Sequence, residues 1–320
     1  MQKIVSRSPG EIFFFGEHAV VYGRRAVVAA IDRWITTTLT KNNDEYVQIN
    51  SSLGTFNAKL HGLRLDVIKA DVHLAPFAHG IERIYKRFGN ATGFTAVIES
   101  ELPVNSGLAS SAASSASLLG GVIALMDKTL SEEDMVHLVF RSEIDIQKIG
   151  SISGSACTVL RGVVGITGNN FNRLDDIVVE PDVIIADSRE SVPTSESTGC
   201  VKDILYKKER EVQGIFDVIH SLATRGEDVL RQKDWRTLGV LMNENQSCLK
   251  QLGVSTRKID NAIESIKLLV YGSKITGAGG GGCFVSLCNK ERVPEVVTIL
   301  KEQGFNAYSC RICTAGDGAG

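Results

Sequence analysis

The residues of this chain that could do chemistry begin with a stretch of small side chains and closely spaced hydroxyls, LPVNSGLASSAASSASLLGG, from Leu102 to Gly121. Small residues let a backbone approach a ligand, and a glycine turn leading into a helix directs unpaired N–H groups outward. With a strand predicted from Phe94 to Leu102, the pattern indicates a phosphate-binding loop. A tight loop before a buried, Ala- and Ser-rich helix explains the same residues equally well.

A second candidate is the glycine run in KITGAGGGGCFVSLC, from Lys274 to Cys288. Five glycines in six positions would lose too much conformational entropy inside a regular element, so we expect an irregular segment. A strand predicted from Cys283 to Leu287 fixes its C-terminal end. We favour a backbone wall against the polar groups of a ligand over a plain hairpin-like loop.

The third candidate is EIFFFGEHAVVYG, from Glu11 to Gly23. Its apolar residues predict a strand over 12–15 that resumes over 19–22, with Gly-Glu-His between the two runs. Ionisable side chains between apolar runs are costly to bury without partners. They form either a polar turn, which is favoured on this segment alone, or the lip of a site where Glu17 and His18 meet a polar ligand.

A charged stripe lies on the helix predicted from Ser131 to Gly150. Arg141, Asp145 and Lys148 occur at i, i+4 and i+7, which places them on one side of the helix. The stripe is either a solvated surface with ordinary ion pairs or part of a site.

Composition restricts the class of protein. The chain has 320 residues, enough for two domains or one large one, and its net charge of −2 gives no electrostatic case for binding nucleic acid or a membrane. No apolar run has spanning length, and the N-terminal residues do not resemble a signal peptide. The seven cysteines are scattered and odd in number, which favours reduced thiols in the cytoplasm.

The order of predicted elements places a domain change near 169–176, and we expect domains over 1–170 and 171–320. We expect a loop over 151–155, a strand over 157–167 and another over 183–187. Three helical segments follow, over 201–232, 235–252 and 256–270.

The three candidate stretches together resemble the motifs of the GHMP kinase superfamily and, within it, of mevalonate kinases. The order and spacing of PGEIFFFGEHAVVYG, PVNSGLASSAA and KITGAGGGGC fit that family. The resemblance implies an α+β fold with a ribosomal-protein-S5-like N-terminal domain, a ferredoxin-like C-terminal domain and an active site in the cleft between them. It also implies ATP, Mg²⁺ and phosphoryl transfer to the 5-hydroxyl of a mevalonate-type substrate; a homodimer is one option for its assembly.

The same resemblance assigns residues by position. The triphosphate would lie on Asn105, Ser106, Gly107, Leu108, Ala109, Ser110 and Ser111. Ser111 and Asp145 would hold the metal ion. The substrate chain would face Glu17 and His18, and the phosphate end would lie against Gly277, Ala278 and Gly279.

Two positions depart from the family pattern. Glu11 stands where the family has a lysine after Pro-Gly, and either Gly154 or Ala156 stands where it has a catalytic aspartate. A general base contributes about 10²- to 10⁴-fold to a rate, whereas phosphoryl transfer depends mostly on positioning and charge stabilisation. Catalysis can therefore persist without the aspartate, and Glu11 is a candidate replacement base.

The absence of the family lysine and aspartate at these two positions also fits a substrate that differs from mevalonate. Arg141, Lys148 and Arg189, with Arg161, are cations that would suit an acceptor with an additional phosphate. The leading hypothesis is a kinase that phosphorylates the 5-hydroxyl of mevalonate 3-phosphate, as a branch of archaeal enzymes does. The alternatives are a mevalonate 5-kinase with a displaced base and a catalytically inactive nucleotide-binding protein on a kinase scaffold.

Overall fold

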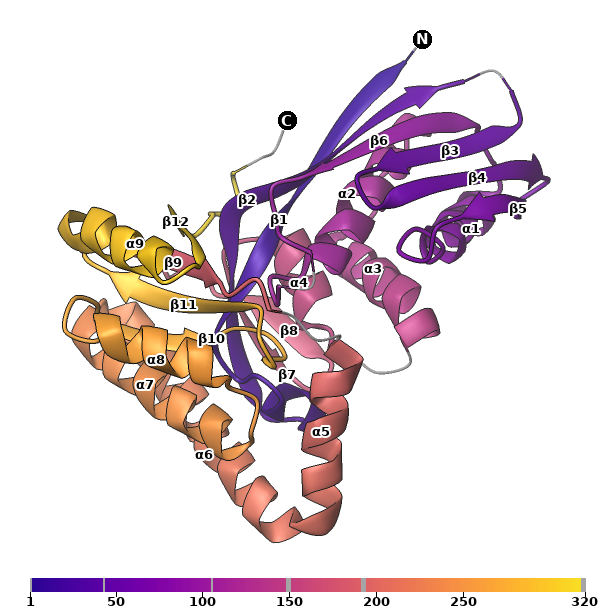
Figure 1. The fold of residues 1–320 in the computed structure, drawn as a ribbon. Coiled ribbons are helices and arrows are strands. Elements are labelled where there is room, and N and C mark those ends of the chain that lie inside the picture. The colour runs from indigo at the N-terminus through magenta and orange to yellow at the C-terminus, as the bar shows by residue number, and fades with distance from the viewer. Residues whose placement is uncertain (1, 43, 105, 148–150, 191–193, 318–320) are drawn as a thin grey trace.

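The structure is a computed structural model, and it describes the chain except residues 1, 43, 105, 148–150, 191–193 and 318–320. It has two β-sheets, each with its own helices, joined along the inner ends of the long strands β1 and β2 (Figure 1). The first sheet has the order β5-β4-β3-β6-β2-β7-β8, and β1 pairs with β2. Its strands are β1 (Lys3–Phe15), β2 (Arg25–Lys41), β3 (Tyr46–Ser51), β4 (Gly54–His61), β5 (Arg64–Ala70), β6 (Phe94–Ser100), β7 (Val163–Thr167) and β8 (Asn170–Arg173).

One face of this sheet is covered by helices. These are α1 (Phe77–Phe88), α2 (Ser110–Leu125), α3 (Glu132–Gln147) and α4 (Ser153–Leu160), with a short 3₁₀ helix η1 (Ala19–Tyr22) after β1. The central helix α2 is almost wholly buried, because its Ala, Ser and Gly residues let it lie close to β1 and β2. The small-residue stretch is thus both a loop and a buried core helix.

The second sheet is fully antiparallel in the order β10-β11-β9-β12. Numbered along the chain and read from the β12 edge, this is the order 4-1-3-2 of a ferredoxin-like β-α-β-β-α-β unit. Its strands are β9 (Asp182–Asp187), β10 (Gly272–Ile275), β11 (Cys283–Cys288) and β12 (Asn306–Cys310). Its helices are α5 (Thr194–Lys207), α6 (Glu209–Gln232), α7 (Trp235–Gln251), α8 (Arg257–Ile266), η2 (Lys290–Arg292) and α9 (Val293–Glu302). The expected two-domain α+β fold is confirmed.

Three local expectations need correction. Residues 19–22 form η1 instead of a strand, because Gly16 (φ 104°) and His18 (φ 60°) turn the chain out of the extended conformation. The loop and strand expected from 151 onward are mostly the helix α4, and the strand β7 begins only at Val163. The expected domain boundary at 170 falls inside β8, so the first sheet extends to Arg173.

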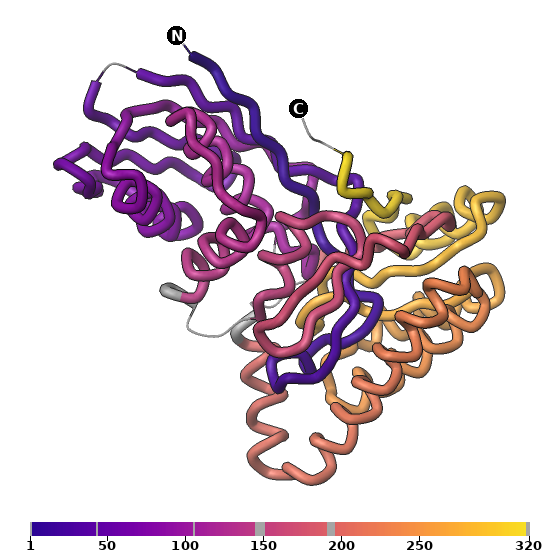
Figure 2. The backbone as a smooth tube through the Cα atoms, turned by 180° about the vertical axis from the view of Figure 1, so that it is seen from behind, coloured from indigo at the N-terminus to yellow at the C-terminus, as the bar shows by residue number. Residues whose placement is uncertain are grey.

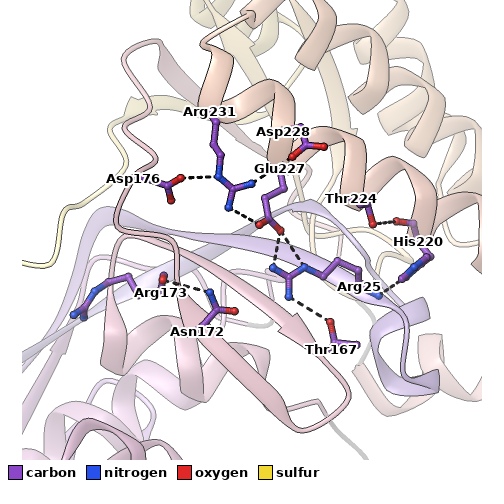
Figure 3. A network of polar contacts seen from close by, with 10 residues as sticks. All are labelled: Arg25, Thr167, Asn172, Arg173, Asp176, His220, Thr224, Glu227, Asp228 and Arg231. Atoms are coloured by element: carbon purple, nitrogen blue, oxygen red, sulfur yellow. Dashed lines mark hydrogen bonds and ion pairs between the residues drawn. The ribbon is translucent and has the colours of Figure 1, made fainter.

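A polar network ties the two halves together away from the glycine segments (Figure 3). Arg25 on β2 forms an ion pair with Glu227 on α6 at 2.6 Å, and Glu227 also pairs with Arg231. Arg231 continues to Asp176, in the connection between the two sheets. The chain trace in Figure 2 shows α6 running beside the loop between β1 and β2, where these contacts form.

Candidate active site

A cavity of about 250 Å³ opens where the three motif stretches converge. Both halves of the molecule line it, as the cleft hypothesis requires. From the first half come Glu11, Phe13, Glu17, His18, Val20, Val21, Ser106, Gly107, Ala109, Ser110, Ser111, Ala112, Phe140, Glu143, Ile144, Ser151, Ser153 and Gly154, and from the second half Thr198, Gly277 and Ala278. Neither Lys nor Arg occurs among these described lining residues.

The first turn of α2 presents its backbone N–H groups to the cavity. Ala109 adopts a left-handed conformation (φ 54°) just before the helix, and no side chain caps it. The first intrahelical bond runs from Ala113 N to Ala109 O at 3.0 Å, so the N–H groups of residues 110–112 precede the hydrogen-bond ladder. This arrangement can bind a phosphate oxygen at the positive end of the helix dipole.

The glycine segment packs backbone to backbone on this loop. Gly107 and Gly277 both have positive φ, and a Cβ on Gly277 would lie 2.7 Å from the Cα of Gly107. The amide of Cys283 donates to the carbonyl of Ser106 at 2.9 Å. Glycine is therefore needed at 277 and 282, because a side chain at either position would push the two loops apart.

A buried ion pair joins the first motif to the third. Lys274 is fully buried and donates to the Glu17 carboxylate and to the carbonyls of Phe13 (3.2 Å) and Ile275 (2.7 Å). Burial raises the pKa of Glu17, and the charge of Lys274 opposes that rise. Asn245 on α7 donates to the other Glu17 oxygen at 3.4 Å. Glu17 thus lines the cavity while the buried ammonium group of Lys274, which does not line it, balances the charge of its carboxylate.

His18 is fixed against the glycine segment. Its Nε2 lies 2.9 Å from the carbonyl oxygen of Ala278, which can only accept, so Nε2 carries the proton. Burial lowers the pKa of His18 to about 4, so the imidazole is neutral at pH 7. Its positive φ places a non-glycine residue in a sparsely populated backbone region, as is common at functional sites.

Glu11 lies on the cavity wall with one oxygen unpaired. It is 2% exposed, and its Oε2 has no hydrogen-bond partner. Burial raises the pKa of this carboxyl well above its ordinary value, the nearby Glu17 charge raises it further, and a hydrogen bond with the Cys157 thiol opposes the rise. Its backbone N–H donates to the carbonyl of Leu108 at 3.0 Å, which ties β1 to the phosphate loop.

Glu143 is a lining residue that the sequence analysis did not single out. It lies on α3 and its carboxyl is hydrogen-bonded with Ser111, while burial raises its pKa to about 7. It is two residues before Asp145, the residue the resemblance assigned to the metal ion. In the sequence, the signal that could have indicated Glu143 is that it is a second acidic residue two positions from Asp145, in the same predicted helix.

A second helix also begins at the cavity. The first hydrogen bond of α4 runs from Ala156 N to Ile152 O at 2.8 Å, so the N–H groups of residues 153–155 lie outside the ladder, and that of Ser153 donates to the Ser151 hydroxyl at 3.3 Å. Gly154, one of the two positions aligned with the family aspartate, lines the cavity in this turn. The other aligned position, Ala156, is fully buried and does not line it.

Several expected site residues lie elsewhere. Arg141 lines a separate groove between α1 and α3, and Arg189 is exposed after β9 with its N–H bonded to Asp187. Leu108 and Gly279 are behind the cavity wall, where Gly279 O accepts from Ser197 at 3.0 Å. Asn105 and Lys148 are outside the described residues, as is the side chain of Asp145, so their assignments stay predictions.

Comparisons with known proteins identify the family of this chain. Residues 77–173 match the family profile described as GHMP kinases N terminal domain, and residues 227–306 match GHMP kinases C terminal. A protein of Archaeoglobus fulgidus named mevalonate kinase is 33% identical over 90% of this chain and 94% of its own. The chain belongs to the GHMP kinase family. It is therefore a phosphotransferase with an alcohol acceptor.

Other relatives of this GHMP kinase support the same assignment. The protein of Methanocaldococcus jannaschii named mevalonate kinase is 29% identical over 97% of this chain and 99% of its own. The crystal structure titled Methanococcus jannaschii mevalonate kinase superposes with a TM-score of 0.85 at 26% identity, covering 98% of this chain and 99% of that one. None of the helices described here is both long and apolar enough to cross a membrane.

Proposed function

We propose that this GHMP kinase acts in the mevalonate pathway and transfers the γ-phosphoryl group of ATP to the 5-hydroxyl of mevalonate 3-phosphate. The names of the relatives support a mevalonate-type acceptor. The observation that carries the additional phosphate is the first turn of α4, where Gly154 stands in place of a carboxylate. A second helix N-terminus without an acidic side chain favours an anion beside the one held by α2.

The residues around Ser111 fit a magnesium ion. Its hydroxyl and the Glu143 carboxylate are hard oxygen ligands, and a cation there would favour the ionised form of a carboxyl whose pKa is raised to about 7. No group of three or more His, Cys, Asp or Glu side chains suited to a metal occurs in the described part of the chain. Mg²⁺ commonly uses few protein ligands and completes its shell with phosphates and water, and when bound it neutralises charge on the phosphates.

The protein groups then act mainly by positioning and electrostatics. The N–H groups at the start of α2 face the negative charge that develops on the transferred phosphoryl group, in a cavity closed by the glycine segment. Gly154 offers no base, and His18 is held as a hydrogen-bond donor to Ala278. Because the transition state of phosphoryl transfer is loose, the acceptor proton can leave late, to a phosphoryl oxygen, without a protein base.

The test compares two acceptors. We expect ATP consumption with mevalonate 3-phosphate to exceed that with free mevalonate by at least tenfold in kcat/KM, with ³¹P NMR showing a second phosphate ester on the product. Equal or better turnover of free mevalonate would instead identify a mevalonate 5-kinase. Nucleotide binding without turnover of either acceptor would identify an inactive homologue.

A substitution tests the role of the α4 turn directly. Gly154→Asp restores a carboxylate there, and its repulsion should lower kcat/KM for mevalonate 3-phosphate by about tenfold or more relative to free mevalonate. Gly154→Ala is the matched control, because a Cβ at this position meets Ala109 and Ala112 at 3.2 Å without adding charge. An equal effect of both variants on both acceptors would mean that the turn does not distinguish them.

Two further features remain predictions. All seven cysteines are free, as expected for a reducing compartment, and we infer a cytoplasmic location. A homodimer stays one option for the assembly.

A further inference from the structure

The Glu11 carboxyl has polar partners for only part of its hydrogen-bonding capacity. The Cys157 thiol hydrogen-bonds it from α4, whereas Oε2 is closed to solvent and unpaired. Burial raises the pKa of Cys157 well above its ordinary value, so the sulfur keeps its proton and acts as a donor. A buried polar atom without a partner costs free energy, about 1–3 kcal/mol, and one on a cavity wall is explained when a ligand supplies the partner.

The surroundings of Glu11 favour an undissociated acid. Glu17 and Glu143 both contribute negative charge to its environment, and neither Lys nor Arg lines the cavity among the described residues. Lys274, a buried cation nearby, is committed to Glu17 and to two carbonyl groups. A triphosphate and an anionic acceptor in the cavity add negative charge, which favours the neutral form of Glu11 still further.

Glu11 lies beside the first turn of α4, the turn that we assign to the phosphate of the acceptor. Its thiol partner Cys157 lies three residues after Gly154, on the helix whose first turn opens into the cavity. In an α-helix residues three apart share a face, so the contact with Cys157 brings Glu11 alongside that first turn. The carboxyl and the α4 N–H groups can then contact the same anion.

We propose that Glu11 is a specificity-determining residue whose Oε2–H donates a hydrogen bond to the phosphate that the acceptor already carries. This rests on the proposed function and deepens it. Glu11 takes the place of the family lysine as a donor, but it carries no charge and does not act as the base. It favours acceptors that present a phosphate oxygen to this part of the cavity over those that present a hydroxyl, because a hydrogen bond to an anionic oxygen is stronger.

Three variants test the proposal. Glu11→Gln keeps a neutral donor of the same shape, Glu11→Leu removes it at similar volume, and Glu11→Asp withdraws it by one methylene. We expect Glu11→Leu to lower kcat/KM for mevalonate 3-phosphate by about 10- to 100-fold, the range for one hydrogen bond to a charged group, mainly through KM. Glu11→Gln should recover most of that loss, Glu11→Asp should be intermediate, and the KM for ATP should not move.

The pH dependence separates a donor from a base. The wild type should lose affinity for mevalonate 3-phosphate as the pH rises through the raised pKa of Glu11 and its carboxyl ionises, and Glu11→Gln should not. A loss in Glu11→Gln as large as that in Glu11→Leu would overturn the proposal and indicate that Glu11 acts as a carboxylate base. Equal losses for both acceptors in Glu11→Leu would also overturn it.

Separate controls test whether the Glu11 variants fold and whether the proposed function itself holds. Glu11→Leu removes a buried carboxyl whose Oε2 is unpaired and whose bond to the Cys157 thiol is weak, so thermal unfolding and binding of an ATP analogue should be retained. If the wild type gains nothing from the 3-phosphate, the proposed function fails before the variants are made. If the wild type prefers mevalonate 3-phosphate and Glu11→Leu keeps the same preference in kcat/KM, the proposed function stands and only the role of Glu11 is wrong.

Discussion

Glu11 and Glu17 are two buried glutamates on the wall of one cavity, and their surroundings differ in almost every respect. Glu17 has a buried ammonium group and an amide as partners, whereas Glu11 has a thiol and an oxygen without a partner. Lys274 reaches Glu17 from β10, in the other half of the molecule, while Glu11 and Cys157 belong to the same half. Glu17 is satisfied by the fold, and Glu11 is left for a ligand.

The difference indicates two uses of a buried acid. A paired charge stabilises one arrangement of the two halves, because removing either partner leaves an uncompensated charge in the interior. An unpaired acid lowers the stability of the free protein and can regain that free energy when a ligand binds. The comparison predicts that substitution at the buried pair lowers the stability of the fold, whereas substitution of Glu11 leaves stability almost unchanged and weakens binding of the acceptor.

The largest effect is expected at the buried pair. Lys274→Met should lower the free energy of unfolding by about 3–5 kcal/mol at pH 8, because Glu17 loses its buried partner. The loss should be smaller at pH 5, since Glu17 then becomes neutral by binding a proton. Denaturant unfolding of the wild type and of Lys274→Met at pH 8 and at pH 5 measures the two losses of stability.

The double variant Glu17→Gln/Lys274→Met is the control. It removes both charges, so most of the lost stability should return, while binding of the acceptor should stay impaired because Glu17 faces the cavity. A double variant as unstable as Lys274→Met alone would mean that packing of the lysine stem, and not its charge, holds the two halves together.

A second prediction concerns Glu143, whose carboxyl has a hydroxyl partner, Ser111, in place of the ammonium group of Glu17 or the thiol of Glu11. Its pKa is about 7 in the folded chain against 4.5 ordinarily, so the folded state binds more protons and stability falls as pH rises from about 4.5 to about 7. This difference between the folded and ordinary pKa values corresponds to at most about 3 kcal/mol of unfolding free energy. Glu143→Gln should therefore gain about that much relative to the wild type between pH 4 and pH 8 in denaturant unfolding, while losing Mg²⁺-dependent activity. A pH-independent difference would contradict the raised pKa.

The sequence predicts the motif loops well and the side-chain roles less well. Glycine runs and small hydroxyls indicate loops by local backbone chemistry, whereas the contact between Gly107 and Gly277 is a property of the folded structure that the local pattern does not contain. The partners of Glu17 and Glu11 come from Lys274 and Cys157, more than 140 residues away, and no local pattern reveals such pairs. Arg141 shows the same limit: helical spacing placed it beside Asp145, but which side of α3 meets the cavity depends on how α3 packs on α1 and α2.

The smallest effect is expected in a more exposed ion pair between the halves, Arg25 with Glu227 (Figure 3). Their side chains are 19% and 14% exposed, so solvent screens them more than the pair at Lys274. Glu227→Gln should cost about 1 kcal/mol in unfolding free energy, and 0.5 M salt should reduce this cost while leaving that of Lys274→Met almost unchanged. Equal salt sensitivity of the two variants would show that the buried pair exchanges with solvent as freely as the outer one, and the distinction between a paired interior charge and a surface contact would then fail for this protein.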